Sequence, residues 1–194
     1  MSGHDYGGYL CNVTPDEYNR RYRHLLPARI KGDEFIKKYG ETDDPVTQID
    51  LDETYSVRGC TEHPIYENHR VQRFIALLDE ANRTGDERAL IRAGELMYAS
   101  HWSYSKRVAL GCKETDLLVT LARRYGVKHG IYGAKITGGG SGGTVAFLIR
   151  DDALPIINRI AEIYHERTGL MPQIFAGSSP GAYQFGCRRL KLHS

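Results

Sequence analysis

Five glycines and one serine make up the six residues from Gly138 to Gly143, the segment of the sequence with the most chemical potential. Glycine adopts positive φ angles without steric cost, and one or two glycines suffice for a tight hairpin. Each further glycine costs about 1 kcal/mol of conformational entropy. Consecutive N–H groups without side chains form a concave nest for an anion or lie against another backbone. We therefore expect this loop to contact an anion or a second loop; the alternative is a flexible hairpin connection.

The surroundings of the loop differ from two common phosphate-binding motifs. No Gly-Lys-Ser/Thr sequence follows the glycines, as a Walker A loop requires. A dinucleotide-binding turn leads into a helix, whereas residues 144–149 are apolar and predict a strand. Thr137 and Thr144 flank the loop and could donate hydroxyl groups at its two rims. We favour an ordinary strand role for both threonines, because β-branched residues are common in strands.

A histidine on the helix expected before the loop is a second candidate. His101 lies next to Trp102 and close to Tyr104, and histidine is the commonest general base. The alternative, which we favour, is a structural histidine whose ring nitrogens are satisfied.

Two charged clusters have simple explanations. Arg20, Arg21 and Arg23 are interleaved with Tyr18 and Tyr22, a pattern that could contact nucleic acid. Residues 41–53 are rich in carboxylates that could hold a cation. Runs of like charge usually face water, so we favour a solvated helix face and a solvated loop.

The pattern of apolar residues and turn signals predicts the elements that position these groups. Strands are expected over Ile131–Thr137 and Thr144–Ile149, on either side of the glycine loop, with the second one buried on both faces. The other expected elements are helices over residues 14–26, 33–39, 67–84, 87–106, 113–125 and 153–167, and strands over residues 173–175 and 183–192. This order predicts an α+β sandwich with a small antiparallel sheet covered on one face by helices. Residues 1–66 form an irregular, short-helix extension, and residues 67–194 form the domain.

Composition narrows the class of protein. The 194 residues carry 26 Lys and Arg against 24 Asp and Glu, so the net charge of +2 gives no reason to expect nucleic acid as a partner. No apolar run approaches the roughly 18 residues of a membrane span, and we expect a cytoplasmic protein without a membrane partner. The four cysteines are far apart and form no C-x-x-C pair, which favours reduced thiols.

The glycine loop also resembles a known family. Residues 133–145, GAKITGGGSGGTV, are similar to the third signature of the GHMP small-molecule kinases. Supporting segments are Ser100-His101 with Ser103, residues 113–119 (KETDLLV), residues 44–47 (DPVT), residues 62–68 (EHPIYEN) and residues 175–182 (FAGSSPGA), which look like galactokinases and plant-type L-arabinokinases. The resemblance implies a ferredoxin-like α/β sandwich over residues 67–194, the GHMP kinase C-terminal domain, preceded by a lobe-junction segment.

The activity that this resemblance implies is a sugar 1-kinase. Such an enzyme transfers the γ-phosphoryl group of ATP to the anomeric hydroxyl of a monosaccharide, with Mg²⁺ as cofactor. The family's phosphate loop and its Asp base belong to an N-terminal lobe that these residues do not contain. The resemblance therefore implies that this lobe is the partner, and that the chain is inactive without it. The alternatives are a galactokinase or heptose kinase lobe, or a non-catalytic binding or regulatory module with the same fold.

The resemblance also assigns site residues. Contact with the phosphate loop of the partner lobe is implied for Thr137, Gly138, Gly139, Gly140, Ser141, Gly142 and Gly143. Ser141 departs from the Phe that galactokinases usually carry there. Tyr55 and Arg58 match a Tyr-x-x-Arg segment in which the tyrosine helps to bind the sugar, and a packing role for Tyr55 is the alternative. No catalytic residue or metal ligand is expected in this chain.

Overall fold

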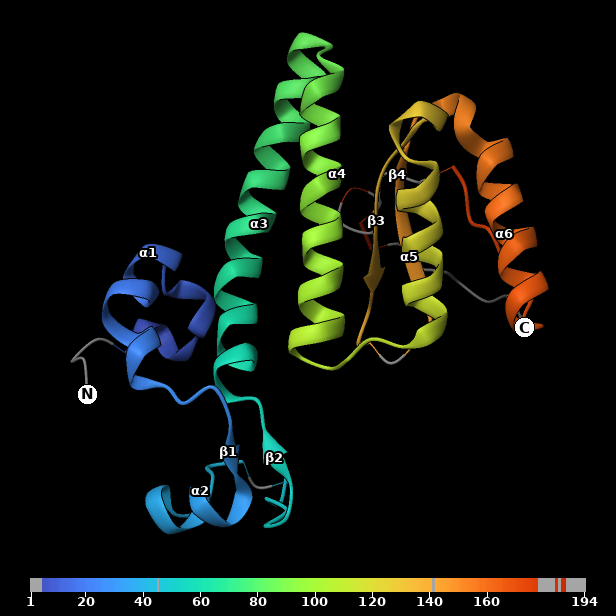
Figure 1. Ribbon diagram of the computed structural model, residues 1–194. Helices are drawn as coiled ribbons and strands as arrows, with labels where there is room; N and C mark the ends of the chain where they lie inside the picture. The colour runs from blue at the N-terminus through green and yellow to red at the C-terminus, as the bar shows by residue number, and fades with distance from the viewer. Residues whose placement is uncertain (1–4, 45, 141, 178–183, 185, 188–194) are drawn as a thin grey trace, which may run out of the picture.

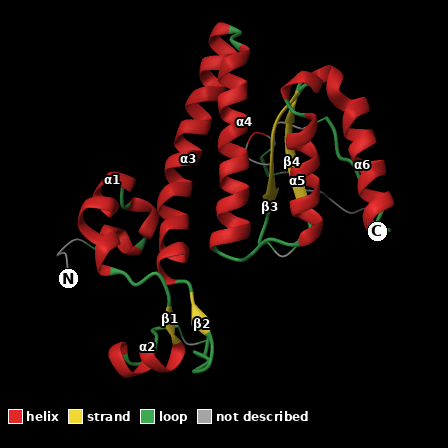
Figure 2. Cartoon of the chain, viewed as in Figure 1, coloured by secondary structure: helices red, strands yellow, loops and turns green. Residues whose placement is uncertain are grey.

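The computed structural model describes residues 5–44, 46–140, 142–177, 184, 186 and 187. Two long helices, α3 and α4, stand side by side in the middle of the molecule (Figure 1). The N-terminal extension lies on one side of them, and the sheet β3–β4 with helices α5 and α6 lies on the other. Helices dominate the chain, as Figure 2 shows.

The N-terminal extension consists of short elements. These are η1 (Tyr6–Gly8), η2 (Leu10–Asn12), α1 (Pro15–Glu17), η3 (Tyr18–Tyr22), η4 (Arg23–Leu25), β1 (Ile30–Lys31), α2 (Gly32–Tyr39) and β2 (Thr54–Tyr55). The Thr14 hydroxyl accepts a hydrogen bond from the Glu17 N–H at 3.2 Å and so caps α1. Val13 and Tyr18 form a small core with Ile65 of α3, which fastens the extension to that helix. The irregular, short-helix character expected for this segment is confirmed.

The first long helix, α3 (Val57–Thr84), begins ten residues earlier than its apolar pattern predicts. Pro64 lies inside it, although proline removes a backbone donor and usually interrupts a helix. The turn around Pro64 is held by its neighbours, because Ile65 is 1% exposed and Glu62 is 7% exposed. The boundary expected between residues 66 and 67 therefore falls within a continuous helix.

A short turn joins α3 to α4 (Glu87–Trp102). Gly85 ends α3 with a φ of +69°, and its N–H donates to the Ala81 carbonyl at 2.8 Å. The Asp86 carboxylate caps α4 by accepting from the Arg88 N–H at 2.9 Å. After α4 come the π-helical segment η5 (Ser103–Arg107), α5 (Lys113–Tyr125) and the short η6 (Val127–His129). The helices expected over residues 87–106 and 113–125 are confirmed, the first with a π-helical last turn.

The sheet contains two antiparallel strands, β3 (Ile131–Thr137) and β4 (Thr144–Ile149), with the bounds that the sequence predicts. Thr137 pairs with Thr144 at the end where the glycine loop joins the strands. The expectation that β4 is buried on both faces is wrong: its residues are half-buried or exposed, whereas β3 is buried along most of its length. The apolar run of β4 predicts burial, but β3 is the strand that the helices on both sides bury more completely.

Helices cover both faces of this sheet, not one face as expected. The short η7 (Asp151–Ala153) leads from β4 into α6 (Leu154–Thr168). On one face, α5 and α6 form the main core with Ile131 and Ala134 of β3 and with Val145, Phe147 and Ile149 of β4. Leu148 points the opposite way and packs with Leu77 of α3 and with Ala89 and Ala93 of α4. The α+β class is confirmed; the difference arises because the α3–α4 pair forms a layer of its own.

The described residues add two points. The helix expected over residues 153–167 is confirmed as α6, whereas residues 173–175 form no strand. Most of the strand expected over residues 183–192 lies outside the described residues. Among the helices that the structure describes, none is long and apolar enough to cross a membrane.

Candidate functional site

The glycine loop connects β3 to β4 at one end of the sheet. Positive φ angles occur at Gly138 (+77°), Gly140 (+87°), Gly142 (+127°) and Gly143 (+101°). L-residues with side chains are strained in this region, so these four positions favour glycine for conformational reasons alone. Gly139 has no such angle, and a Cβ atom at this position would meet no atom of the described residues within 4 Å. Ser141 lies outside the described residues.

Gly140 is the point at which the loop touches the rest of the chain. A Cβ atom there would lie 2.6 Å from the Leu110 carbonyl oxygen and 2.9 Å from the Tyr104 hydroxyl. Leu110 belongs to the connection between η5 and α5, residues 108–112, which we call the bracing loop. Its N–H donates to the Tyr104 carbonyl at 3.3 Å, so the bracing loop is tied back to η5. Gly140 thus has a close backbone neighbour within this chain, whereas the expected contact of the loop with an anion or a phosphate-holding loop stays a prediction.

His101 holds the strand that leads into the glycine loop. The side chain is 0% exposed, and its Nδ1 accepts a hydrogen bond from the Ile136 N–H at 3.3 Å. Its Nε2 lies 3.2 Å from Asp116 Oδ1. A neutral ring that accepts at Nδ1 carries its proton on Nε2, facing the carboxylate. A structural role for His101 agrees with its burial and its Nδ1 hydrogen bond. The expectation that both ring nitrogens are satisfied is met only at Nδ1, because Nε2 lies at ion-pair distance from Asp116 without hydrogen-bond geometry among the described residues.

Burial lowers the pKa of His101, and the neighbouring Asp116 charge opposes this shift only in part. The imidazole is therefore neutral at pH 7. For Asp116, burial acts to raise the pKa, but hydrogen bonds from Lys106 and Ser105 outweigh it and hold the pKa below its ordinary range. Both bonds are 2.7 Å long. The site thus contains an ionised carboxylate beside a neutral histidine.

A known family matches the part of the chain that contains the glycine loop and the His101–Asp116 pair. The model of the family described as "GHMP kinases C terminal" matches residues 74–166, from the middle of α3 to the end of α6. The chain belongs to the GHMP kinases, through their C-terminal domain. This GHMP domain contains β3, β4, the glycine loop and the His101–Asp116 pair.

Individual relatives agree with the family. The chain is 46% identical to the L-arabinokinase of Arabidopsis thaliana. The alignment is 194 residues long and covers 94% of the chain and 18% of the relative. It is 32% identical to the galactokinase of Thermotoga maritima over 161 residues, which cover 81% of the chain and 41% of that relative. The chain therefore spans less than half the length of either relative.

A solved structure shows a related fold. The crystal structure of Lactococcus lactis galactokinase complexed with galactose aligns with a TM-score of 0.50 and 22% identity. The alignment covers 88% of this chain and 40% of the galactokinase chain.

A second polar cluster connects α3, α4 and β3. The Glu67 carboxylate accepts hydrogen bonds from the Ser100 hydroxyl and, at 2.7 Å, from Arg70 Nε. Lys135, two residues before the loop, lies 3.4 Å from the same carboxylate. Burial acts to raise the pKa of Glu67, but these hydrogen bonds outweigh it, so the pKa lies below its ordinary range. The cluster fixes β3 against the long helices.

Glu62 connects the N-terminal extension to the segment before the bracing loop. This carboxylate is 7% exposed and accepts from Arg107 Nη1 at 2.8 Å and from Arg23 Nε at 3.0 Å. The Tyr18 hydroxyl lies 3.5 Å away. Arg107 is the last residue of η5, so Glu62 helps to set where the bracing loop begins.

The two predicted sugar-binding residues lie near the start of α3. The Tyr55 hydroxyl accepts from the Asp50 N–H at 2.9 Å, and its side chain is 38% exposed. Arg58 Nη2 donates to the Leu26 carbonyl at 2.7 Å. Among the hydrogen bonds of the described residues, none joins Tyr55 or Arg58 to the glycine loop. Their role in sugar binding stays a prediction.

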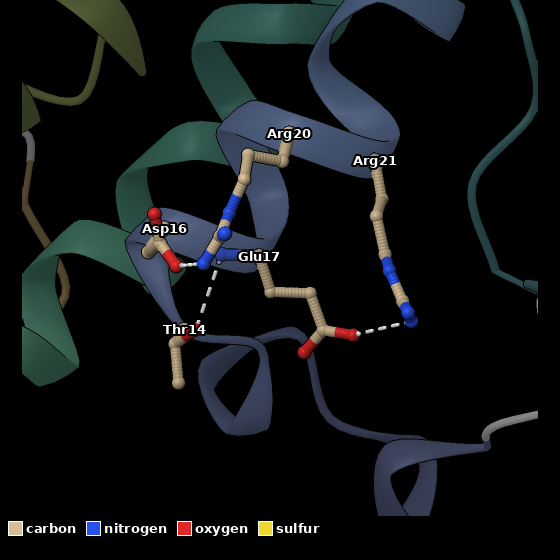
Figure 3. A pocket seen from close by; sticks show the side chains of 5 residues that line it. All are labelled: Thr14, Asp16, Glu17, Arg20 and Arg21. Atoms are coloured by element: carbon tan, nitrogen blue, oxygen red, sulfur yellow. Dashed lines mark hydrogen bonds and ion pairs between the residues drawn. The ribbon is translucent and has the colours of Figure 1, made fainter.

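A shallow hollow on the extension is lined by Thr14, Asp16, Glu17, Arg20 and Arg21 (Figure 3). Arg20 pairs with Asp16, and Arg21 Nη1 lies 3.1 Å from Glu17 Oε1. Both arginine side chains are more than half exposed. These i,i+4 pairs fit the solvated helix face that we favour for this basic cluster, and we assign it no binding role.

Sequence analysis gave no role to Asp116, Leu110 or Glu62. The sequence does contain a signal that points to a partner such as Asp116: the inward stripe of α4 changes from apolar to polar at Ser100 and His101. A buried polar residue on a helix requires a partner from another element. No local pattern identifies that partner.

Proposed function

We propose that this chain supplies the C-terminal domain of an ATP-dependent sugar 1-kinase of the L-arabinokinase type. The enzyme transfers the γ-phosphoryl group of ATP to the anomeric hydroxyl of a monosaccharide. The relatives in the GHMP family support a sugar kinase, and the 46% identity to an L-arabinokinase favours that sugar over galactose.

The observation that carries the proposal is Gly139. Neither its backbone angle nor any described atom within 4 Å of its Cβ position requires glycine. Gly138 and Gly143 are equally open to the described residues, although their positive φ angles favour glycine. A glycine that no described part of the chain requires fits a loop that another group approaches closely, such as a phosphate or a phosphate-holding loop. Residues 137–143 would provide this contact.

The remaining parts of the reaction belong to the partner. In the described residues, no three His, Cys, Asp or Glu side chains gather to hold a metal, so we assign no Mg²⁺ ligand to this chain. We propose that the N-terminal lobe of the kinase supplies the phosphate cradle, the metal site and the base, and that the present domain is inactive without it. A cytoplasmic location is part of the same proposal.

The test is sugar-dependent ADP release by the domain together with its N-terminal lobe. We expect turnover with L-arabinose, weaker or no turnover with galactose and a heptose, and none by this chain alone. Gly140→Val should lower kcat by about 100-fold, because it displaces the loop from the bracing loop. Gly85→Val is the control, because it places valine at another glycine of positive φ, between α3 and α4, and it should keep kcat.

The outcomes separate the candidate functions. Turnover with galactose but with neither of the other sugars would change the assigned activity from L-arabinokinase to galactokinase. No turnover with any sugar, from a folded two-lobe protein, would leave a non-catalytic module. Tyr55→Phe tests the sugar contact. Loss of the hydroxyl should raise KM for the sugar if Tyr55 binds the sugar, and should leave KM unchanged if Tyr55 only packs.

A further inference from the structure

We propose that Asp116 and His101 are positioning residues that hold the glycine loop from two sides, one through β3 and the other through the bracing loop. This inference rests on the proposed function only in so far as it assigns the loop a part in phosphoryl transfer. Asp116 lies in the first turn of α5 and contacts neither the glycine loop nor its strands directly in the hydrogen bonds of the described residues. It acts through other side chains.

The first connection runs through His101 to β3. Asp116 Oδ1 lies 3.2 Å from His101 Nε2, and His101 Nδ1 accepts from the Ile136 N–H at 3.3 Å. Ile136 immediately precedes Thr137, the residue at which the loop begins. The ring is 0% exposed, hydrogen-bonded at Nδ1 and within ion-pair distance of the carboxylate at Nε2, so the end of the strand is held relative to α4 and α5.

The second connection runs through Ser105 to the bracing loop. Asp116 Oδ1 also accepts from the Ser105 hydroxyl at 2.7 Å. Ser105 packs against Gly111, where its side-chain atoms fill the space that a Cβ would need. The neighbouring Leu110 presents its carbonyl oxygen to Gly140, 2.6 Å from the Cβ position. The same carboxylate oxygen thus contacts both His101, which holds the end of β3, and Ser105, which packs against the bracing loop.

The cost of this arrangement argues against simple packing. A fully buried histidine and a carboxylate that is only 19% exposed are largely desolvated, and apolar residues of similar size often stabilise a core as well or better. What the polar pair provides is a defined direction for each contact. A loop with positive φ at four glycines has little conformational preference of its own and depends on such supports.

Hydrogen exchange of the full 194-residue chain tests the two connections separately. Asp116→Ala should speed exchange at least about tenfold in both the bracing loop and residues 136–144, because it removes both connections. His101→Gln, which has no acceptor at the δ position, should affect residues 136–144 only. Ser105→Ala should affect the bracing loop and the Gly140 contact. Asp116→Asn keeps an acceptor at Oδ1 and should restore most of the protection.

The control is Asp152→Ala, which removes an exposed carboxylate paired with Arg150 at 2.6 Å and should leave both loops unchanged. Exchange in α6 is the internal reference. The proposal is wrong if Asp116→Ala raises exchange in α6 as much as in the two loops. It is also wrong if this variant raises exchange in neither loop. If that variant does not fold, His101→Gln and Ser105→Ala decide, and the absence of a loop response in both overturns it.

A kinetic arm applies to the two-lobe kinase. His101→Gln should lower kcat about tenfold or more while KM for the sugar stays within about twofold, because a displaced loop misaligns the reaction without removing sugar contacts. A change in KM alone contradicts the positioning role. A kinase without turnover on any sugar would refute the proposed function, while the exchange result would still decide the positioning role.

Discussion

The carbonyl oxygen of Leu110 lies 2.6 Å from the point at which a Cβ atom on Gly140 would stand. Two loops that are thirty residues apart in sequence are therefore in direct backbone contact. This contact, together with the positive φ of Gly140, accounts for one glycine of the loop from within the chain. It also makes separate experiments possible for backbone conformation and backbone contact.

Gly140→Ala and Gly138→Ala separate the two effects, since both positions have positive φ but only Gly140 has close neighbours. We expect Gly138→Ala to destabilise the protein by about 1 kcal/mol through backbone strain. Gly140→Ala should cost about 3 kcal/mol, because overpacking adds to the same strain. Urea denaturation measures both. Equal losses would show that the contact with Leu110 contributes nothing.

Gly94→Ala tests how tightly α4 lies against β3. A Cβ on Gly94 would collide with the Tyr132 carbonyl and lie 2.9 Å from the Gly133 nitrogen. Helix propensity would favour alanine by about 1 kcal/mol, but forcing two backbones apart should cost about 3 kcal/mol or more. We therefore expect a lower Tm in thermal unfolding. A Tm equal to or above that of the unchanged protein would contradict this packing.

Stability should fall as the pH drops below about 6.5, the ordinary pKa of histidine. Burial lowers the pKa of His101 in the folded state, so the unfolded chain binds the proton first and acid favours unfolding. The groups that face His101 are Asp116, Lys106 and Lys135, and the pKa of Asp116 is also lowered, so it stays ionised in this range. Burial gives His63 a shift of the same sign.

Denaturant titrations between pH 5 and pH 7 check this expectation. The slope of unfolding free energy against pH should decrease in His101→Gln and decrease further when His63→Gln is added. A slope that is the same in the unchanged protein and the double variant would refute the assignment.

Glu62→Gln should destabilise the protein by about 1 to 2 kcal/mol, because it weakens hydrogen bonds from two arginines to one buried carboxylate. The value stays modest since the Arg23 and Arg107 side chains are 49% and 52% exposed and regain water. Glu162→Gln breaks a pair with Arg159 of the same 2.8 Å length, in which both side chains are more than half exposed. That control should change stability by about 0.5 kcal/mol or less. Equal effects of the two variants would remove the special role of Glu62.

Local sequence patterns predicted the glycine loop, its two flanking strands and the helices α4 to α6, because each has a period or a terminating glycine within a few residues. They did not predict the helix through Pro64, since Ile65 and Glu62 stabilise that turn by contacts with Tyr18, Arg23 and Arg107, far away in sequence. The His101–Asp116 pair escaped for the same reason. Its members lie on different helices, and the fold alone brings them together.

The continuity of α3 determines where this protein can be shortened. Its 28 residues span about 42 Å as one rod, from the N-terminal extension to the turn before α4. A chain starting at residue 67 would lose the turns that carry Glu62 and His63, which contact Arg107 at 2.8 Å and Ser103 at 3.0 Å. Both ends of η5 would lose these contacts, and the bracing loop would lose part of its support. A shortened chain that keeps the glycine loop in place must begin before Val57.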